Sequence, residues 1–398
     1  MHTVESARER MLDAVRPLGG EPVCLESASE RTLAEPVFAA RDQPPFRSAA
    51  MDGYAVRSAE LGKGRFTVVG EAAAGSAHQG TVGPAQTVRI FTGAPVPPGL
   101  DTVIPQERTQ RDGTAVIVDA TAQPGKNIRD AAIDFAAGSK LIDAGTRLHA
   151  RHIALIAAAG IGSVTVSRRP RVALLASGSE IATPGHPAGP YQIYDSVTFG
   201  LGAMIESWGG LALRHAAAKD EAPAISAALS DAVCNADLVV VVGGASVGDY
   251  DIVKQVLATR GLEVSVPKIA VRPGKPTWFG AMEQIPILGL PGNPAAAFVC
   301  ATLFLRPLLR ALAGGNRFIH CVSAVLDGGV DECGENETYW RARATVREDA
   351  RLVARPFDKQ DTSLVSIFAA SNALVRRVAH SEPAHTGALV EVLLLDCS

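Results

Sequence analysis

Three glycine-containing turns, each directly after a run of aliphatic residues, are the first positions at which this chain could do chemistry. They span residues 177–180, 243–251 and 290–294. Ligands of open parallel sheets collect at the carboxyl ends of the strands, where glycine lets backbone N–H groups approach an oxyanion. In the third turn we expect Asn293 to cap a helix and Pro294 to begin it, which would aim free N–H groups at the same crevice. Together the three turns predict one anion-binding edge of a sheet.

A cationic turn adds positive charge of the kind that an anionic substrate needs. Lys268, Arg272 and Lys275 surround the tight Pro-Gly turn at residues 273–274. Ammonium and guanidinium groups donate charge-assisted hydrogen bonds to phosphate and similar oxyanions. We therefore predict that this turn helps to bind a phosphate or another oxyanion.

Carboxylates lie at or after the same strand ends. They are Glu180, Asp220, Asp249 and Asp251. Beside phosphate-binding loops, carboxylates usually indicate a hard cation such as Mg²⁺ that bridges protein and ligand oxygens. Taken singly, each acid is better explained as an exposed loop charge or a helix cap, so the prediction of Mg²⁺ depends on their grouping.

Composition limits the classes of protein to which the chain can belong. Of its 398 residues, 47% are hydrophobic and 20% are charged, which is typical of a folded globular protein. The net charge of −3 gives no general attraction to nucleic acid or to an anionic membrane. Six cysteines without a C-x-x-C pair indicate a reducing compartment. We expect a soluble cytoplasmic protein, because residues 291–294 break the long uncharged stretch 284–305 into a buried strand and helix.

The elements that must position these residues predict a multidomain α/β plus β protein. From residue 171 to about 313, aliphatic runs such as 172–176 and 238–242 alternate with helical stretches, which predicts a central doubly wound α/β domain. Short β-like runs separated by Gly and Pro precede and follow it, and predict a β-rich insertion and a small C-terminal β domain. The predicted domains are residues 1–43 with 140–169 (N-terminal), 44–139 (inserted, β-rich), 170–314 (α/β) and 315–398 (C-terminal β).

Seven motifs then occur in one order along nearly the whole chain. They are MDGYAVR at 51–57, TGAPVP at 92–97, GKNIR at 125–129, IYDS at 193–196, the glycine loop at 243–251, PGKP at 273–276 and GLPGNP at 289–294. With this set the chain resembles the molybdopterin molybdenumtransferase family, which includes MoeA and the E domain of gephyrin.

The resemblance implies an elongated, four-part subunit in a homodimer, with residues 170–314 as the molybdopterin-binding domain. It implies an active site at this domain that the second subunit completes. The implied substrates are adenylylated molybdopterin and molybdate, used with Mg²⁺; AMP is released and the metal is inserted at the dithiolene. Other proteins of the molybdenum-cofactor pathway are further expected partners.

The strand-end argument and the resemblance together predict the site residues. The predicted catalytic residues are Asp52, Thr92, Asp134, Glu180, Asp220, Asp251, Lys268 and Lys275. The predicted substrate-binding residues are Gly178, Ser179, Gly243, Gly244, Ser246, Gly248, Asp249, Arg272, Pro291, Gly292, Asn293 and Pro294. Asp251 and Glu180 are the predicted metal ligands.

The chain departs from the family pattern at positions where polar groups or glycine are usual. These departures are Ala49, Ala132, Ile133, Ser179, Val197 and Ala296. Because they remove polar groups, two alternatives stay open beside the molybdenumtransferase. One is a non-catalytic protein that binds molybdopterin or organises partners. The other is a molybdopterin adenylyltransferase, which resembles the α/β domain alone and which the long flanking domains disfavour.

Overall fold

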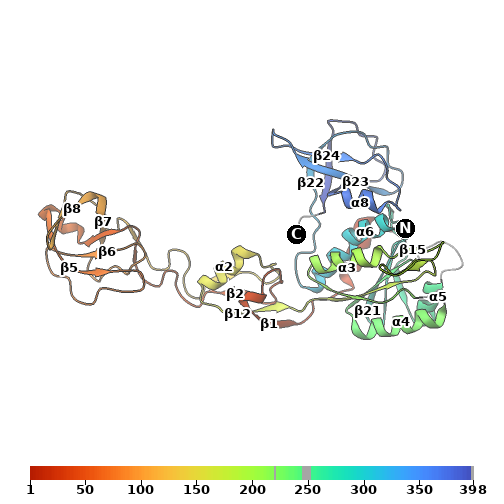
Figure 1. Ribbon diagram of the computed structural model, residues 1–398, viewed down its shortest axis with the longest axis horizontal. Helices are drawn as coiled ribbons and strands as arrows, with labels where there is room; N and C mark the ends of the chain where they lie inside the picture. The colour runs from red at the N-terminus through yellow and green to blue at the C-terminus, as the bar shows by residue number, and fades with distance from the viewer. Residues whose placement is uncertain (219–220, 244–251, 396–398) are drawn as a thin grey trace.

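The computed structural model describes residues 1–218, 221–243 and 252–395. Figure 1 shows an elongated molecule with a β-rich body at one end and a smaller body carrying α2 beside it. The α/β domain and the C-terminal strands lie at the other end. Strands β5 to β8 therefore lie at the opposite end of the molecule from the α/β domain (Figure 1).

The α/β domain is built on a six-stranded sheet in the order β16-β13-β17-β21-β20-β18. Every residue of β17 is buried, because helices cover both faces of the sheet and leave no solvated side. The first four strands in this order are parallel, whereas β20 pairs antiparallel with both of its neighbours, β21 and β18. The strands are β13 (Arg171–Ala176), β16 (Leu211–Arg214), β17 (Leu238–Val242), β18 (Glu263–Val266), β20 (Trp278–Met282) and β21 (Ile285–Leu290).

Two apolar cores hold the helices against this sheet. One core contains buried residues of the segments around α3, α6 and α7, and the other contains those of α4 and α5. The continuous helical run 294–312 is long and apolar enough to cross a membrane, but 94% of its most apolar window is buried in the core. The helices are α3 (Val197–Ser207), α4 (Ala222–Asn235), α5 (Ile252–Thr259), α6 (Pro294–Cys300), the π-helical turn Ala301–Leu305 and α7 (Arg306–Leu312). The predicted doubly wound fold is confirmed.

The first helix, α1 (Val4–Asp13), belongs to the α/β core. Its buried residues Val4, Ala7 and Met11 share a cluster with the sheet and with α7, and His2 bridges to Ile269. This differs from our grouping of all of residues 1–43 with the N-terminal domain. The apolar face of α1 has to be covered, and the open face of the α/β domain covers it.

The C-terminal strands close into a small barrel. The strand order is β19-β23-β24-β22-β26-β25, and β23 also pairs with β25. The first strand of this order, β19, comes from the α/β part of the chain and pairs with the start of β23, which ties the two domains together. The elements are β19 (Val271–Arg272), β22 (Val322–Leu326), β23 (Glu337–Val346), β24 (Leu352–Pro356), α8 (Val365–Ala370), β25 (Ala373–Arg377) and β26 (Leu389–Leu394).

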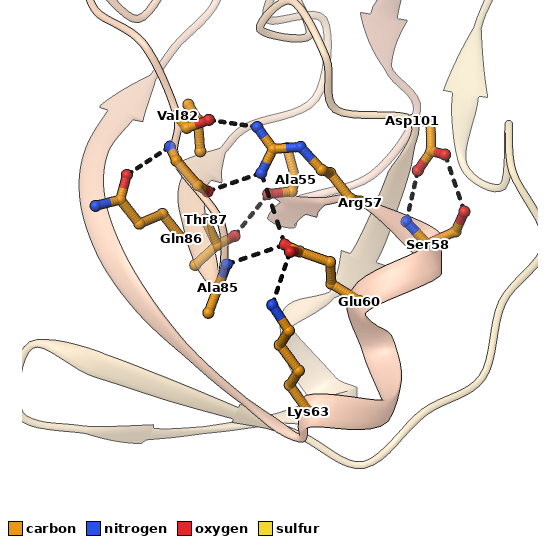
Figure 2. Close-up of polar contacts among 11 residues, drawn as sticks. Ala55, Arg57, Ser58, Glu60, Lys63, Val82, Ala85, Gln86, Thr87 and Asp101 are labelled. Carbon is orange, nitrogen blue, oxygen red and sulfur yellow. Dashed lines mark hydrogen bonds and ion pairs between the residues drawn. The ribbon is translucent and has the colours of Figure 1, made fainter.

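The body at the far end is a six-stranded sheet in the order β7-β4-β6-β5-β9-β8. Figure 2 shows how the 3₁₀ segment Ser58–Lys63 is held: Arg57 donates to the carbonyl of Val82, and Glu60 accepts from Lys63 and from the N–H of Ala85. These bonds fix the loop before β6 onto the sheet. The strands are β4 (Gly53–Val56), β5 (Arg65–Ala72), β6 (Gln86–Ile90), β7 (Thr102–Pro105), β8 (Thr109–Asp112) and β9 (Ala115–Val118), with a 3₁₀ turn at Gln106–Arg108.

Short antiparallel pairs connect this body to the α/β domain. Strand β1 pairs with β12, β2 with β11, and β3 with β10, so each pair brings together a segment before β4 and one after β9. The elements are β1 (Gly20–Cys24), a 3₁₀ turn (Leu25–Ser27), β2 (Val37–Phe38), β3 (Ser48–Ala49), β10 (Ile128–Arg129), β11 (Lys140–Ile142), α2 (Ala150–Ala158) and β12 (Ser163–Ser167). A further parallel pair, β14 (Ile181–Ala182) with β15 (Ile193–Tyr194), follows the first glycine turn.

Candidate functional site

The carboxyl ends of three neighbouring parallel strands meet at one edge of the α/β sheet. Strands β13, β17 and β21 pair in register and end just before Ser177, Gly243 and Pro291. The N–H of Gly243 donates to the carbonyl of Leu290 (3.2 Å), and a Cβ on Gly243 would lie 3.3 Å from the Ser177 carbonyl oxygen. Gly243 has φ +86°, a conformation that favours glycine. The three turns therefore lie side by side, as the alternating pattern predicts.

A cavity of about 540 Å³ opens beside the third turn. Its α/β side is formed by the cationic turn, with Arg272 and Lys275, and by Pro291 and Asn293. The pairing of β19 with β23 brings the cationic turn against the C-terminal barrel, which forms the opposite wall. Lys268 is exposed and does not line this cavity; its carbonyl accepts from the N–H of His2 (3.1 Å).

The C-terminal wall was not predicted from the sequence. It contributes Asn336, Thr338, Tyr339, Trp340, Gln360, Asp361 and Thr362. Hydrogen bonds from Ser363 lower the pKa of Asp361, so a carboxylate faces the cavity together with Arg272 and Lys275. The Asp-Thr-Ser run at 361–363 indicates an exposed polar turn in the sequence, but it carries no signal for contact with the α/β domain.

Asn293 occupies the predicted N-cap position and Pro294 begins α6, but the side chain of Asn293 does not cap the helix. Its Nδ2 donates to Thr362 Oγ1 (2.8 Å), and the N–H of Ala295 donates to the Thr362 carbonyl (3.0 Å). The C-terminal barrel thus satisfies an N–H that we expected to be free for a ligand. Gly292 remains exposed at the edge, and a Cβ there would lie 3.6 Å from Gly243 Cα.

Glu180 lies in the first turn, where it is exposed. Gly178 is buried with φ +151°, and a Cβ on it would lie 2.7 Å from the Glu180 carboxylate, so glycine is required for the carboxylate to fold back over the turn. The carbonyl of Ser179 accepts from Gln192 Nε2 (3.1 Å). Within the described ranges, no group of three or more acidic, histidine or cysteine side chains is placed to hold a metal ion.

Six of the predicted site residues fall outside the part of the chain that the structure describes. They are Asp220, Gly244, Ser246, Gly248, Asp249 and Asp251.

Asp52 and Thr92 form a pair at the far end of the molecule. The N–H and the Oγ1 of Thr92 both donate to Asp52 Oδ1 (2.7 Å each), and these bonds lower the pKa of Asp52. Asp134 is exposed in the connection between β10 and β11. Figure 1 places β6 and β7, which pair with β4, at the opposite end from the α/β domain, so one chain does not bring Asp52 and Thr92, which lie next to β4 and β6, to the cavity.

Comparison with known families decides what this architecture is. Residues 2–160 match the MoeA N-terminal region (domains I and II), residues 173–311 match a probable molybdopterin-binding domain, and residues 324–395 match the MoeA C-terminal region (domain IV). The chain belongs to the MoeA family.

Similar proteins extend this match over the full length of this MoeA-family chain. A molybdopterin molybdenumtransferase of Nostoc sp. is 40% identical over 303 residues, which cover 74% of this chain and 70% of the relative. A protein of the same name from Haemophilus influenzae is 32% identical and covers 94% of both chains. A solved MoeA structure from Pyrococcus horikoshii superposes with a TM-score of 0.85 at 32% identity, covering 100% of this chain and 99% of that one.

Two departures from the usual family pattern now have a structural setting. Ala296, one of the departures at which the family pattern has a polar group, lines the cavity. Ala132 adopts φ +59°, a left-handed conformation that suits the glycine usual there better than alanine. The first departure affects the chemistry of the cavity and the second affects the stability of the loop.

Proposed function

We propose that this chain transfers molybdenum from molybdate to adenylylated molybdopterin and releases AMP. The observation that carries the proposal is the cavity between the cationic turn, the edge of the parallel sheet and the C-terminal barrel. The relatives that match most of the chain bear the name molybdopterin molybdenumtransferase, which supports the same reaction. We place the reaction in the cytoplasm, in agreement with the unpaired cysteines of the described residues.

In this proposal the cationic turn holds oxyanions. Arg272 and Lys275 both face the cavity and lie beside Pro291, at the edge where parallel-sheet proteins bind ligands. Arg272 supplies a planar fork for two oxygen atoms, whereas Lys275 supplies a compact charge. Asp361 on the opposite wall carries a negative charge and repels an anion that approaches that wall.

A magnesium ion would take Glu180 and Asp251 as protein ligands and complete its shell with substrate phosphate oxygens. Mg²⁺ is commonly held by one or two carboxylates and by substrate phosphates. Of the two predicted ligands, only Glu180 lies in the described part of the chain, and its exposed position is compatible with this arrangement. When bound, the ion would neutralise phosphate charge.

Replacement of Asp251 by asparagine tests this metal site. We expect Asp251→Asn to lower magnesium-dependent AMP release at least about a hundred-fold, because the amide keeps the size but removes the charge. The far-ultraviolet circular dichroism spectrum should stay unchanged. AMP release at the wild-type rate would remove Asp251 from the reaction.

We also propose a homodimer in which a second copy brings Asp52, Thr92 and Asp134 to the cavity, because one chain keeps the strands next to Asp52 and Thr92 at the opposite end of the molecule. Light scattering should give twice 41.4 kDa. Asp52→Asn and Lys275→Ala should each lower AMP release when tested alone. A mixture of the two chains should regain activity, because random pairing into heterodimers leaves about a quarter of all sites intact. A monomer, or a mixture that stays inactive, would contradict the composite site.

Replacement of Lys275 by alanine tests the oxyanion role of the turn. The variant loses one charge-assisted contact, worth about 1.5–3 kcal/mol, so binding of molybdate or of the pterin phosphate should weaken about ten- to a hundred-fold. Lys140→Ala is the matched control, because Lys140 pairs with Asp143 on the surface of another part of the chain (2.6 Å). Equal affinity of Lys275→Ala and wild type for both ligands would show that the turn is structural.

A second candidate function is a non-catalytic molybdopterin-binding protein, which Ala296 in the cavity wall favours. The two functions are separated by incubating the protein with adenylylated molybdopterin, molybdate and Mg²⁺ and following AMP. The proposed transferase releases AMP in step with metal insertion. Tight binding of molybdopterin without release of AMP would assign the chain to the second function.

A further inference from the structure

A second cavity, of about 270 Å³, lies at the joint between the N-terminal strands and the α/β domain. Arg31 and Arg147 reach it from the N-terminal side, whereas Arg168, Arg169 and Arg310 reach it from the linker before β13 and from α7. Strands β1 and β12 lie at this joint in Figure 1. The cavity is thus a meeting point of guanidinium groups from two parts of the molecule.

This arginine cavity lies at the opposite edge of the sheet from the proposed active site. Arg168 and Arg169 precede β13, and Gly209, which also lines the cavity, precedes β16. These are the amino ends of the parallel strands, whereas the cationic turn and the glycine turns follow the carboxyl ends. A ligand here would therefore occupy a different site from the molybdenum substrates.

Three of the arginines already have a carboxylate partner. Arg31 pairs with Glu21, and Arg168 forms two hydrogen bonds to Asp237 (2.9 and 2.8 Å). Arg147 pairs with Glu30 (2.9 Å), which also contacts His149 (3.0 Å). Of the residues that the structure describes, Glu30 is the one carboxylate that lines the cavity itself.

The other two arginines have only carbonyl partners among the described residues. Arg169 donates to the carbonyls of Gly209 (3.2 Å) and Gly210 (2.6 Å), and Arg310 donates to that of Phe318 (3.3 Å). No carboxylate in the described part of the chain lies within ion-pair distance of either side chain. Their positive charges therefore have no carboxylate counter-charge within ion-pair distance among the described residues.

The electrostatics of the cavity are strained in the absence of an anion. Burial and then the charge of Arg147 lower the pKa of Arg310. Within the described residues, the Nε of Arg147 is buried and has no hydrogen-bond partner. Half-buried cations that repel one another lower the stability of a fold unless something negative neutralises them.

We propose that this arginine cavity is a binding site for a tetrahedral oxyanion of the phosphate class. Guanidinium groups bind such anions through paired N–H donors, and the volume suits a free anion or the phosphate group of a small ester. A bound anion would link Arg147 of the N-terminal part to Arg169 of the linker and to Arg310 of α7. It would stiffen the joint that positions the far β-rich body.

The test measures inorganic phosphate binding to the full-length protein by calorimetry and by thermal unfolding. Phosphate should bind saturably and raise Tm above the value in chloride at the same ionic strength. Arg169→Gln and Arg310→Gln should each weaken phosphate binding at least about tenfold. Arg351→Gln is the control for loss of one charge, because Arg351 is on the surface with a side chain that is 73% exposed.

The sign of the stability change separates a ligand site from a structural cluster. Without phosphate, Arg310→Gln should leave Tm unchanged or raise it, because it relieves repulsion with Arg147. With phosphate, wild type should gain stability and the variant should not. A loss of Tm in both buffers, or phosphate no better than chloride for the wild type, would overturn the proposal.

Two further arms identify the site and the source of the phosphate. Lys275→Ala should retain phosphate binding, because Lys275 lies at the other edge of the sheet. If Lys275→Ala instead lost phosphate binding, the anion would be bound at the cationic turn and the proposal would be overturned. Binding of glycerol phosphate as tight as that of phosphate would assign the site to a phosphate ester, and weaker binding would assign it to the free anion. Both results support the site.

Discussion

Gly274 in the cationic turn offers a quantitative test of how the α/β core positions Lys275. It has φ +119°, which side-chain-bearing residues rarely adopt, and a Cβ there would overlap the Sγ of Cys300 on α6. The next nearest atoms, Val271 Cγ1 at 3.4 Å and Thr277 Oγ1 at 3.6 Å, would make ordinary contacts. Two separable costs are therefore expected from Gly274→Ala: backbone strain and one overlap with a buried sulfur.

The expected magnitude follows from these two costs. An L residue in a sparsely populated backbone region costs about 1–3 kcal/mol, and overpacking of a filled core costs about 1–3 kcal/mol. Gly274→Ala should therefore lower the free energy of unfolding by about 2–6 kcal/mol, the sum of these two terms. Cys300 is fully buried, where burial raises the pKa of its thiol to about 12, so the sulfur is neutral and its removal exposes no charge.

Removal of the sulfur isolates the overlap. In the double variant Gly274→Ala with Cys300→Ala, the overlap is relieved and the strain remains, so the two substitutions should couple favourably by about 1–3 kcal/mol. Cys300→Ala alone should destabilise modestly, by about 1–2 kcal/mol, because it leaves a small cavity. Gly334→Ala is the control, since Gly334 has open space around its Cα and no positive φ.

Denaturant unfolding followed by tryptophan fluorescence measures these changes. The tryptophans, Trp208, Trp278 and Trp340, all lie in the α/β and C-terminal parts, so the signal reports the region that was changed. Molybdate affinity should fall with Gly274→Ala and partly recover in the double variant, because the turn carries Lys275. Additive effects in the double variant would refute the argument that Cys300 sets the position of this turn.

Two further predictions concern the far β-rich body and its connection. Thr92→Val removes one of two hydrogen bonds to Asp52 and should raise the pKa of that carboxyl. Because these bonds lower the pKa in the folded protein, the contact is intact at neutral pH. It is lost only as pH falls through this lowered pKa, below the usual value of about 3.9. An NMR titration of the carboxyl carbon measures this pKa, and equal values in both proteins would contradict the assignment. Ala132→Gly should leave stability unchanged or raise it by up to about 1 kcal/mol, because φ +59° suits glycine; a clear loss on thermal unfolding would contradict this.

The doubly wound core could be predicted from the sequence because its signal is local. The aliphatic runs at 172–176 and 238–242 leave no polar face, so their strands must be covered on both sides, and they form β13 and β17 in one parallel sheet. The turns after these strands then had to lie at the same edge. Their positions follow from the covalent order of strand, glycine turn and helix, which no distant contact can change.

The composition of the cavity could not be predicted in this way. Asn293 and Thr362 are hydrogen-bonded although they are 69 residues apart, and their contact depends on how the C-terminal barrel sits against the sheet. The short pairing of β19 with β23 sets that orientation. For the same reason the sequence suggested a free helix terminus at Ala295, whereas the folded chain satisfies its N–H.

The remaining differences have the same origin. The sequence by itself determined which segments are strands, which turns carry glycine and which side chains are charged. Only the tertiary structure decided that α1 packs on the α/β core, that Asp52 lies at the far end of the molecule and that five arginines meet at the joint. Local patterns specify elements through backbone conformation and burial, whereas contacts between elements arise from packing faces that no short stretch of sequence contains.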